Sequence, residues 1–226
     1  MTPVDDLVTL VQRELSERAD ADKAISMQRY MKTDMPFYGV QKPGRKKVMR
    51  AVRTSFAPKD REEYIAACTA LWALPRREEK YLAQAVATTY RTYVVPGSIS
   101  LFRRFIVEGA WWDFVDETAT HMIRPLVVDH PHEVWPFVDR WIDDPDMWLR
   151  RTAIICQVGA KESTDADRLF DFCRRRAHES EFFIRKAIGW ALREYSKTDA
   201  DTVRSFTTDH RDVLSGLSYR EATKYV

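Results

Sequence analysis

A carboxylate and two tryptophans in one short segment are the residues best placed for chemistry on a cation. The segment WWDFVD puts Asp116 four residues after Trp112. On a helix, that spacing places the indole and the carboxylate on the same face. Neighbouring helical side chains point about 100° apart, so we expect one of Trp111 and Trp112 to face a cleft. An acid beside an aromatic wall could bind a positively charged species. The commoner alternative is an exposed aspartate paired with an arginine.

A cluster of basic residues near the N-terminus could bind a polyanion. Residues 41–53, QKPGRKKVMRAVR, hold six cations and no acid. Lys46, Arg50 and Arg53 fall on one face of a helix, for which Pro43 is a favourable start. Such a face suits a DNA backbone, and a solvated helix surface explains it equally well. The cations are Lys42, Arg45, Lys46, Lys47, Arg50 and Arg53.

Other catalytic patterns are missing from the sequence. The five histidines form no H-E-x-x-H pair, and the three cysteines form no C-x-x-C pair, so we expect no metal site. No G-x-x-x-x-G-K-[ST], G-x-G-x-x-G or G-x-S-x-G segment occurs, which argues against the common nucleotide-binding loops and the serine hydrolases. We interpret the cysteines as buried thiols in a reducing compartment.

Helices must position these residues. Only 7 of the 226 residues are glycine, and apolar side chains recur at helical spacing, as in Ile184, Ile188 and Leu192. Proline and glycine interrupt the chain every 10 to 20 residues or so, including at Pro125, which predicts about twelve helices and no strand. The segment 148–153 resembles 183–188 at an offset of 35 residues. The sequence therefore predicts an all-α, HEAT-like repeat solenoid forming one domain, residues 1–226.

Composition narrows the class of protein further. Hydrophobic residues make up 45% and charged residues 31%, which argues against disorder. No apolar run reaches the roughly 18 residues that a membrane span needs, and the first ten residues lack a basic signal region. We therefore expect a cytoplasmic protein that does not bind membranes. The net charge of +2 says little about partners, because it averages over the chain.

Several motifs together resemble the AlkD family of DNA glycosylases, which repair alkylated DNA. The resemblance runs along nearly the whole chain, and the most specific motif is EFFIRKAIGWALREYSKT. The resemblance implies a HEAT-like solenoid whose concave, basic face holds duplex DNA. It also implies release of N3- and N7-alkylated purines, with no metal or cofactor. The markers are residues 27–45, 71–78, 111–116, 148–154 and 181–198.

The same resemblance assigns roles to individual residues. It implies that Asp116 is the catalytic carboxylate and that Trp112 and Trp190 are the aromatic walls of the site. Arg151 would position the site and contact a phosphate, although Arg150 precedes it directly and either could face the DNA. The spacing of Trp148 and Arg151 mildly favours Arg151. Further residues are expected at the DNA or in packing, namely Tyr30, Arg193, Phe182 and Phe183.

The chemistry expected of such a site needs few groups. A purine alkylated at N3 or N7 already carries positive charge and leaves without a general acid. Asp116 would stabilise the oxocarbenium-like charge that develops on the deoxyribose. The resemblance also implies that the target base need not be flipped into a protein pocket, unlike in most glycosylases. We expect a monomer that joins the nucleoid when bound to DNA. The alternatives are a non-catalytic HEAT-like DNA-binding protein and an α-solenoid scaffold for peptides or RNA.

Overall fold

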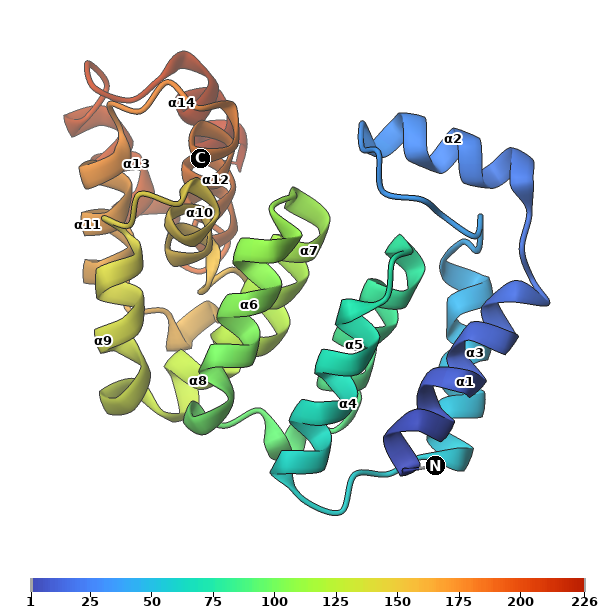
Figure 1. The fold of residues 1–226 in the computed structure, drawn as a ribbon. Coiled ribbons are helices and arrows are strands. Elements are labelled where there is room, and N and C mark those ends of the chain that lie inside the picture. Colours follow the sequence, from blue (N-terminus) through green and yellow to red (C-terminus); the bar gives the residue numbers. More distant parts are fainter. Residues whose placement is uncertain (1, 226) are drawn as a thin grey trace. The chain divides into compact units, whose positions relative to one another are not determined.

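A computed structural model describes residues 2–225, and every regular element among them is a helix (Figure 1). The chain is 75% helical, with no strand in the described residues. It divides into two compact units, Met1–Val94 and Val95–Val226, which we describe separately. The predicted all-α class is confirmed. The single domain and the concave basic face stay predictions.

The first unit is a bundle in which α1 packs on α3 and α4, and α4 packs on α5. An apolar stripe on α1, Leu7, Val11 and Leu15, is fully buried because its spacing keeps it on one helix face. By contrast, α2 buries only Met31. The elements are α1 (Pro3–Ser16), α2 (Ala21–Met31), α3 (Lys42–Ser55), α4 (Arg61–Ala73), α5 (Arg77–Thr89) and η1 (Arg91–Tyr93).

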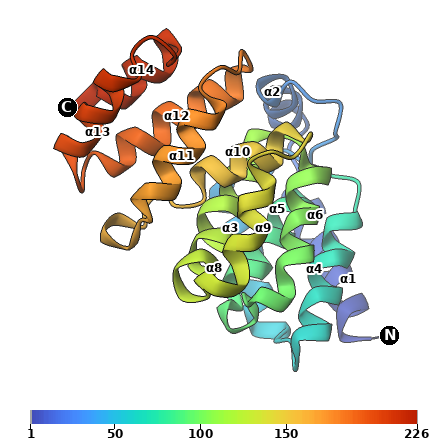
Figure 2. The same ribbon diagram turned by 90° about the vertical axis from the view of Figure 1, so that its left-hand side faces the viewer.

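The second unit continues as helices that pack on their neighbours along the chain (Figure 2). α6 packs on α7, α8 on α9, and α10 on both α9 and α12. Its elements are η2 (Pro96–Ser98), α6 (Ile99–Gly109), α7 (Trp112–Thr118), η3 (Ala119–Ile123), α8 (Arg124–Asp129), α9 (Pro131–Trp141), α10 (Met147–Ile155), η4 (Lys161–Ser163), α11 (Ala166–Arg176), α12 (Phe182–Tyr195), α13 (Ala200–Asp209), α14 (Gly216–Ala222) and η5 (Thr223–Tyr225).

The two similar sequence segments lie in two helices that pack against each other. Residues 148–153 lie in α10 and residues 183–188 lie in α12, and these helices pack against each other. Equivalent positions, such as Trp148 and Phe183, therefore lie side by side, with ring centroids 4.9 Å apart. The short repeat places two similar helix starts next to each other.

The helical backbone runs through Pro125, where the sequence predicted a break. η3 is a π-helical turn that ends two residues before the proline, and it joins α7 to α8 without a loop. Proline cannot donate the backbone hydrogen bond that an α-helix requires at that point. A π turn changes the bonding register there, and such turns are frequent at functional sites. The turn follows the segment that carries Asp116.

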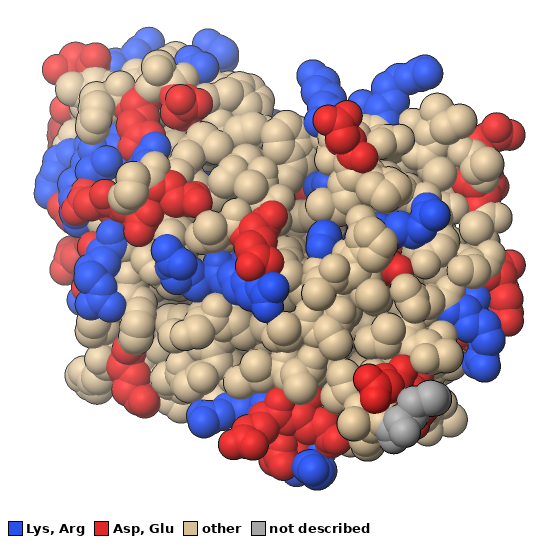
Figure 3. Space-filling model, viewed as in Figure 1, with Lys and Arg blue, Asp and Glu red and all other residues tan. Residues whose placement is uncertain are grey.

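The surface of the second unit carries charges of both signs. Figure 3 shows Lys and Arg side chains interspersed with Asp and Glu over α9, α11 and α13. Arg168 of α11 reaches Asp139 of α9 at 3.1 Å, and Arg175 and Arg176 both pair with Asp143. These cations are therefore balanced locally. Within residues 2–225, no helix has the length and apolar character needed to cross a membrane.

Candidate functional site

The centre of the candidate site is an ion pair between α7 and α10. Arg151 Nε donates to Asp116 Oδ1 at 2.8 Å, and its second nitrogen donates to Oδ2 at 2.9 Å. A third nitrogen of Arg151 donates to the Phe183 carbonyl at 2.6 Å. Such two-pronged pairing fixes the plane of the carboxylate as well as its position. Arg151 therefore joins α7, α10 and the first turn of α12.

The pair is largely buried, and the carboxylate is the more accessible member. The Arg151 side chain is 6% exposed and the Asp116 side chain is 20% exposed. Burial raises the pKa of Asp116 above its ordinary value, while the Arg151 hydrogen bonds and charge lower it and Asp113 raises it further. Arg151 thus favours the ionised carboxylate in a place where burial opposes it.

An aromatic cluster lies beside Arg151, whose guanidinium carbon is 5.8 Å from the Phe183 ring centroid. Trp111 packs against Trp148 and Phe183, with ring centroids 6.1 and 5.5 Å away. Trp111 is thus the member of the tryptophan pair that joins the aromatic cluster, and Trp112 opens α7 one turn before Asp116. Phe182 stacks edge-on against Phe183 and is 52% exposed. An exposed ring next to this half-buried cluster is available to a ligand.

One face of α12 adds cations beside the aromatic cluster. Phe183, Lys186, Trp190 and Arg193 recur every three or four residues, so they lie on one side of the helix. Burial lowers the pKa of Lys186, and the charges of Arg193 and Arg151 lower it further. Lys186 therefore lies near the Asp116–Arg151 pair. Sequence reasoning missed Lys186, although its spacing from Phe183 and Trp190 could have found it.

A close approach of α14 to α12 supplies the partner of these cations. Glu221 accepts from Lys186 Nζ at 2.8 Å and also pairs with Arg193. The helices can approach because residue 189 is glycine: a Cβ at Gly189 would lie 2.5 Å from the Glu221 Cβ. Sequence reasoning also missed Glu221, since nothing along the chain links it to α12.

Arg150 has a different environment from Arg151. Its guanidinium pairs with Glu179 at 2.9 and 3.1 Å and donates to the Asp144 and Pro145 carbonyls. These bonds tie the start of α10 to the loops around it. The structure thus separates the two neighbouring arginines, with Arg151 at the carboxylate and Arg150 in the loop framework. Contact of either one with DNA stays a prediction.

The other predicted DNA-binding residues belong to the first unit. Tyr30, on α2, is 72% exposed. Most of the basic cluster forms the solvent side of α3, whereas Arg45 is half-buried, with its guanidinium 4.4 Å from the Tyr81 ring centroid. The exposed members of the cluster are Lys42, Lys46, Lys47, Arg50 and Arg53.

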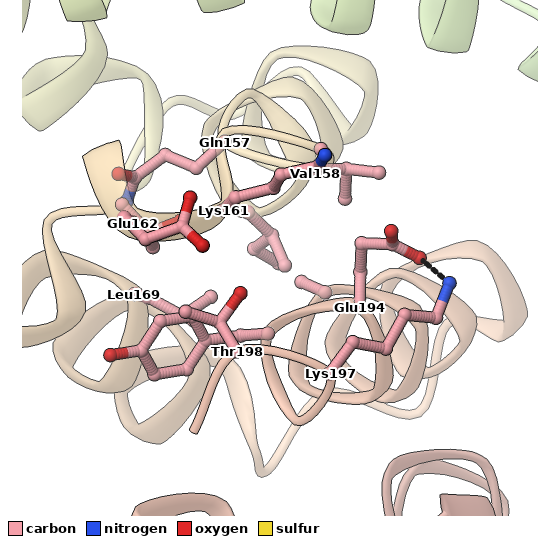
Figure 4. A pocket seen from close by; sticks show the side chains of 13 residues that line it. Gln157, Val158, Lys161, Glu162, Leu169, Glu194, Lys197 and Thr198 are labelled. Carbon is pink, nitrogen blue, oxygen red and sulfur yellow. Dashed lines mark hydrogen bonds and ion pairs between the residues drawn. The ribbon is translucent and has the colours of Figure 1, made fainter. Parts of the chain in front are cut away.

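A separate cavity of about 240 Å³ lies elsewhere in the second unit. It is lined from the C-terminal ends of α10 and α12, and Glu194 and Lys197 pair at its edge (Figure 4). None of Asp116, Arg151 and Phe183 lines it, so this cavity is not part of that site. Among residues 2–225, no three His, Cys, Asp or Glu side chains group closely enough to hold a metal ion.

Comparison with known proteins shows the family of this chain. A family model for DNA alkylation repair enzymes matches residues 11–226. The chain belongs to this family. A solved structure described as a predicted DNA alkylation repair enzyme from Enterococcus faecalis is similar to this chain, with 30% sequence identity and a TM-score of 0.84. That likeness covers 92% of this chain and 96% of the other. A search of curated protein sequences finds no match.

The match to the family spans the helices that form the candidate site. The matched range includes α7, α10 and α12, which together hold Asp116 and Arg151. The role of a DNA alkylation repair enzyme is the repair of alkylated DNA, with DNA as its partner. The resemblance found in the sequence is thus confirmed at the level of the family.

Proposed function

We propose that this DNA alkylation repair enzyme is a DNA glycosylase that releases cationic N3- and N7-alkylated purines, such as 3-methyladenine and 7-methylguanine, from duplex DNA. The observation that carries the proposal is the Asp116 carboxylate, held in plane by Arg151 and still 20% exposed beside aromatic rings. A carboxylate used only for packing would have no need of that exposure.

The geometry leaves Asp116 free to act on a substrate. Each carboxylate oxygen accepts one bond from Arg151, and a carboxylate has about four acceptor sites. The remaining lone pairs can accept from a water molecule and face the sugar. In the proposed reaction the C1′–N bond breaks, and its electron pair neutralises the cationic base as it leaves. Water adds to C1′ and loses a proton, which gives an abasic site.

Electrostatics supplies the rate enhancement. At about 4 Å and an effective dielectric near 20, one charge pair is worth ~4 kcal/mol, or up to about 10³ in rate. Trp112 and Trp190 would add about 0.5–2 kcal/mol each by cation–π attraction to the developing sugar charge. A neutral lesion such as uracil lacks the activated leaving group and should be a poor substrate.

The test is release of 7-methylguanine and 3-methyladenine from methylated duplex DNA. We expect release by the native chain and a loss of about a hundredfold or more for Asp116→Asn, with DNA affinity retained. Asp129→Asn removes the same charge at an exposed position at the end of α8 and is the matched control, expected to keep its activity. Equal release by the Asp116→Asn variant refutes the proposed role. Binding without release by the native chain supports the non-catalytic DNA-binding alternative.

A further inference from the structure

The first unit contains a cavity of about 360 Å³ between α2, the start of α3 and α5, a size within the range of small-molecule sites. It is separate from the Asp116–Arg151 pair, since every residue that lines it belongs to the first unit. α2 covers one side of it and buries only Met31. The proposed reaction leaves this cavity without a use.

Apolar and aromatic side chains form the interior of the cavity. Met31 and Phe37 are 6% and 5% exposed and form its floor. Met27 adds a polarisable thioether, and Tyr30 and Tyr81 add aromatic rings. Tyr30 is 72% exposed, so its ring is open to contact. Thioethers and aromatic rings pack well against a flat ring system, so the interior suits a planar ligand.

The two cations at the rim are already engaged. Lys23 pairs with Asp20, the N-cap residue of α2. The Arg45 guanidinium lies 4.4 Å from the Tyr81 ring centroid and donates to the Val40 carbonyl at 3.0 Å. No acid is among the described residues that line the cavity, so a cationic ligand would find no counter-charge. Because an apolar floor also opposes burial of an unpaired charge, the chemistry favours a neutral ligand.

Two neutral side chains give the cavity a hydrogen-bonding edge. Gln41 begins α3 without a side-chain bond to that helix, so its amide is available to a ligand. An amide supplies both donors and an acceptor, and the Ser26 hydroxyl can serve as either. The ligand that matches this edge carries donors and acceptors around a flat ring, as a nucleobase does.

The chain segment between α2 and α3 is held by the start of α5. Glu78 is fully buried and accepts the backbone N–H groups of Tyr38, Gly39 and Val40 at 2.8 to 2.9 Å. Gly39 has φ of +85°, and a Cβ there would collide with the Asp20 carbonyl oxygen. This wall of the cavity is therefore formed before a ligand arrives, which lowers the entropy cost of binding.

We propose that this cavity binds a neutral purine base. The base stacks on the tyrosine rings and the methionine thioethers, and its polar edge pairs with the Gln41 amide. A purine has two fused rings and so offers the largest flat face among the bases. A purine alkylated at N3 or N7 loses its positive charge when the C1′–N bond breaks, so the proposed reaction releases ligands of this class. Only that source of the base rests on the proposed function.

Methionine methyl groups provide a direct readout of occupancy. We expect titration of the full chain, with ¹³C-methyl-labelled methionine, by adenine or by 7-methylguanine to shift the signals of Met27 and Met31. The signals of Met122 and Met147, in the second unit, should stay in place. Because the base is added free, this result does not depend on whether the chain releases bases from DNA.

Charged analogues test the preference for a neutral ligand. Adenosine monophosphate should gain no affinity over adenine, because the rim offers its phosphate no free cation. At pH 6, 7,9-dimethylguaninium carries a positive charge on the same ring system as 7-methylguanine. It should bind about tenfold more weakly, because the lining supplies no acid. The proposal is overturned if the phosphate raises the affinity, or if the cation binds as tightly as the neutral base.

Variants at the rim test the location. Ser26 is exposed, so Ser26→Trp should fill the cavity without removing a packed side chain and should abolish the two shifts. Ile25→Trp adds the same ring at the neighbouring position of α2, outside the lining, and should keep them. Gln41→Leu should weaken adenine binding about fivefold, since a neutral hydrogen bond is lost. Circular dichroism of the three variants reports whether the helices remain folded.

The results separate this proposal from the proposed function. It is overturned if neither base shifts the Met27 and Met31 signals, or if the shifts persist in Ser26→Trp. Unchanged adenine affinity in Gln41→Leu overturns the assignment to a base, because apolar contact alone would then explain the binding. Failure of the native chain to release bases from methylated DNA refutes the proposed function and leaves binding of the free base intact.

Discussion

Removal of the Arg151 side chain should destabilise the second unit strongly. Arg151→Met keeps much of the side-chain volume but leaves the Asp116 carboxylate without its two hydrogen bonds. Breaking a buried ion pair from one side costs about 3–5 kcal/mol. Because 20% of the Asp116 side chain still meets water, we expect the lower end of that range, about 3 kcal/mol. At roughly 2–4 °C per kcal/mol, the unfolding temperature should fall by about 6–12 °C.

Chemical denaturation of four proteins measures this directly: the native chain, Arg151→Met, Asp116→Asn, and the double variant. Since each single change leaves a buried group without its partner, the double variant should be less destabilised than the sum of the two, by about 2 kcal/mol. A loss of less than about 1 kcal/mol in the free energy of unfolding for Arg151→Met would refute the conclusion that this buried ion pair holds α7, α10 and α12 together. Strictly additive losses in the double variant would refute it as well.

Three further predictions concern pH, packing and DNA affinity. The rate of base release, after the rate of the Asp116→Asn variant is subtracted at each pH, should fall in acid as the Asp116 carboxylate becomes protonated. Because burial raises the pKa of Asp116, the midpoint of this fall should lie above the ordinary 3.8. A midpoint at or below 3.8 contradicts this prediction. In chemical denaturation, Glu78→Gln should lower the free energy of unfolding by about 3 kcal/mol, because one of the three charge-assisted bonds from the backbone becomes a donor–donor contact. The control Glu62→Gln, at an exposed position, should change the free energy of unfolding by no more than about 0.5 kcal/mol. Lys46→Gln should reduce the slope of log affinity for duplex DNA against log salt concentration by about 0.9. Arg204→Gln, a control in which the lost charge is already paired with Asp201, should leave the slope unchanged. An unaltered slope for Lys46→Gln would show that Lys46 does not contact the DNA.

Much of this arrangement could be predicted from local patterns. Apolar spacing and the scarcity of glycine predict the helices, because these signals act within a few residues. The four-residue spacing of Trp112 and Asp116 predicts their shared face on α7. The expectation that Trp111 and Trp112 point in different directions also follows from helix geometry, and the structure places Trp111 in the aromatic cluster.

What the sequence left open depends on contacts between distant segments. Asp116 and Arg151 are 35 residues apart, and only the packing of α7 on α10 brings them together. The different environments of Arg150 and Arg151 depend on Glu179, which pairs with Arg150 and lies on neither helix. The break expected at Pro125 was wrong, because a π turn keeps the backbone helical up to α8. No single residue type predicts such a turn.

Because α14 approaches α12 closely at Gly189, the Glu221 carboxylate on α14 offsets part of the positive charge on α12. Glu221 pairs with both Lys186 and Arg193, so the three groups together carry a single positive charge. A larger residue at position 189 would push α14 away and leave two uncompensated cations on the face that also carries Trp190. Such a face would attract phosphate more strongly and, by the same field, would oppose a positive charge forming on the sugar. If the chain is the glycosylase that we propose, the glycine would set a compromise between holding DNA and stabilising the charge that base release creates.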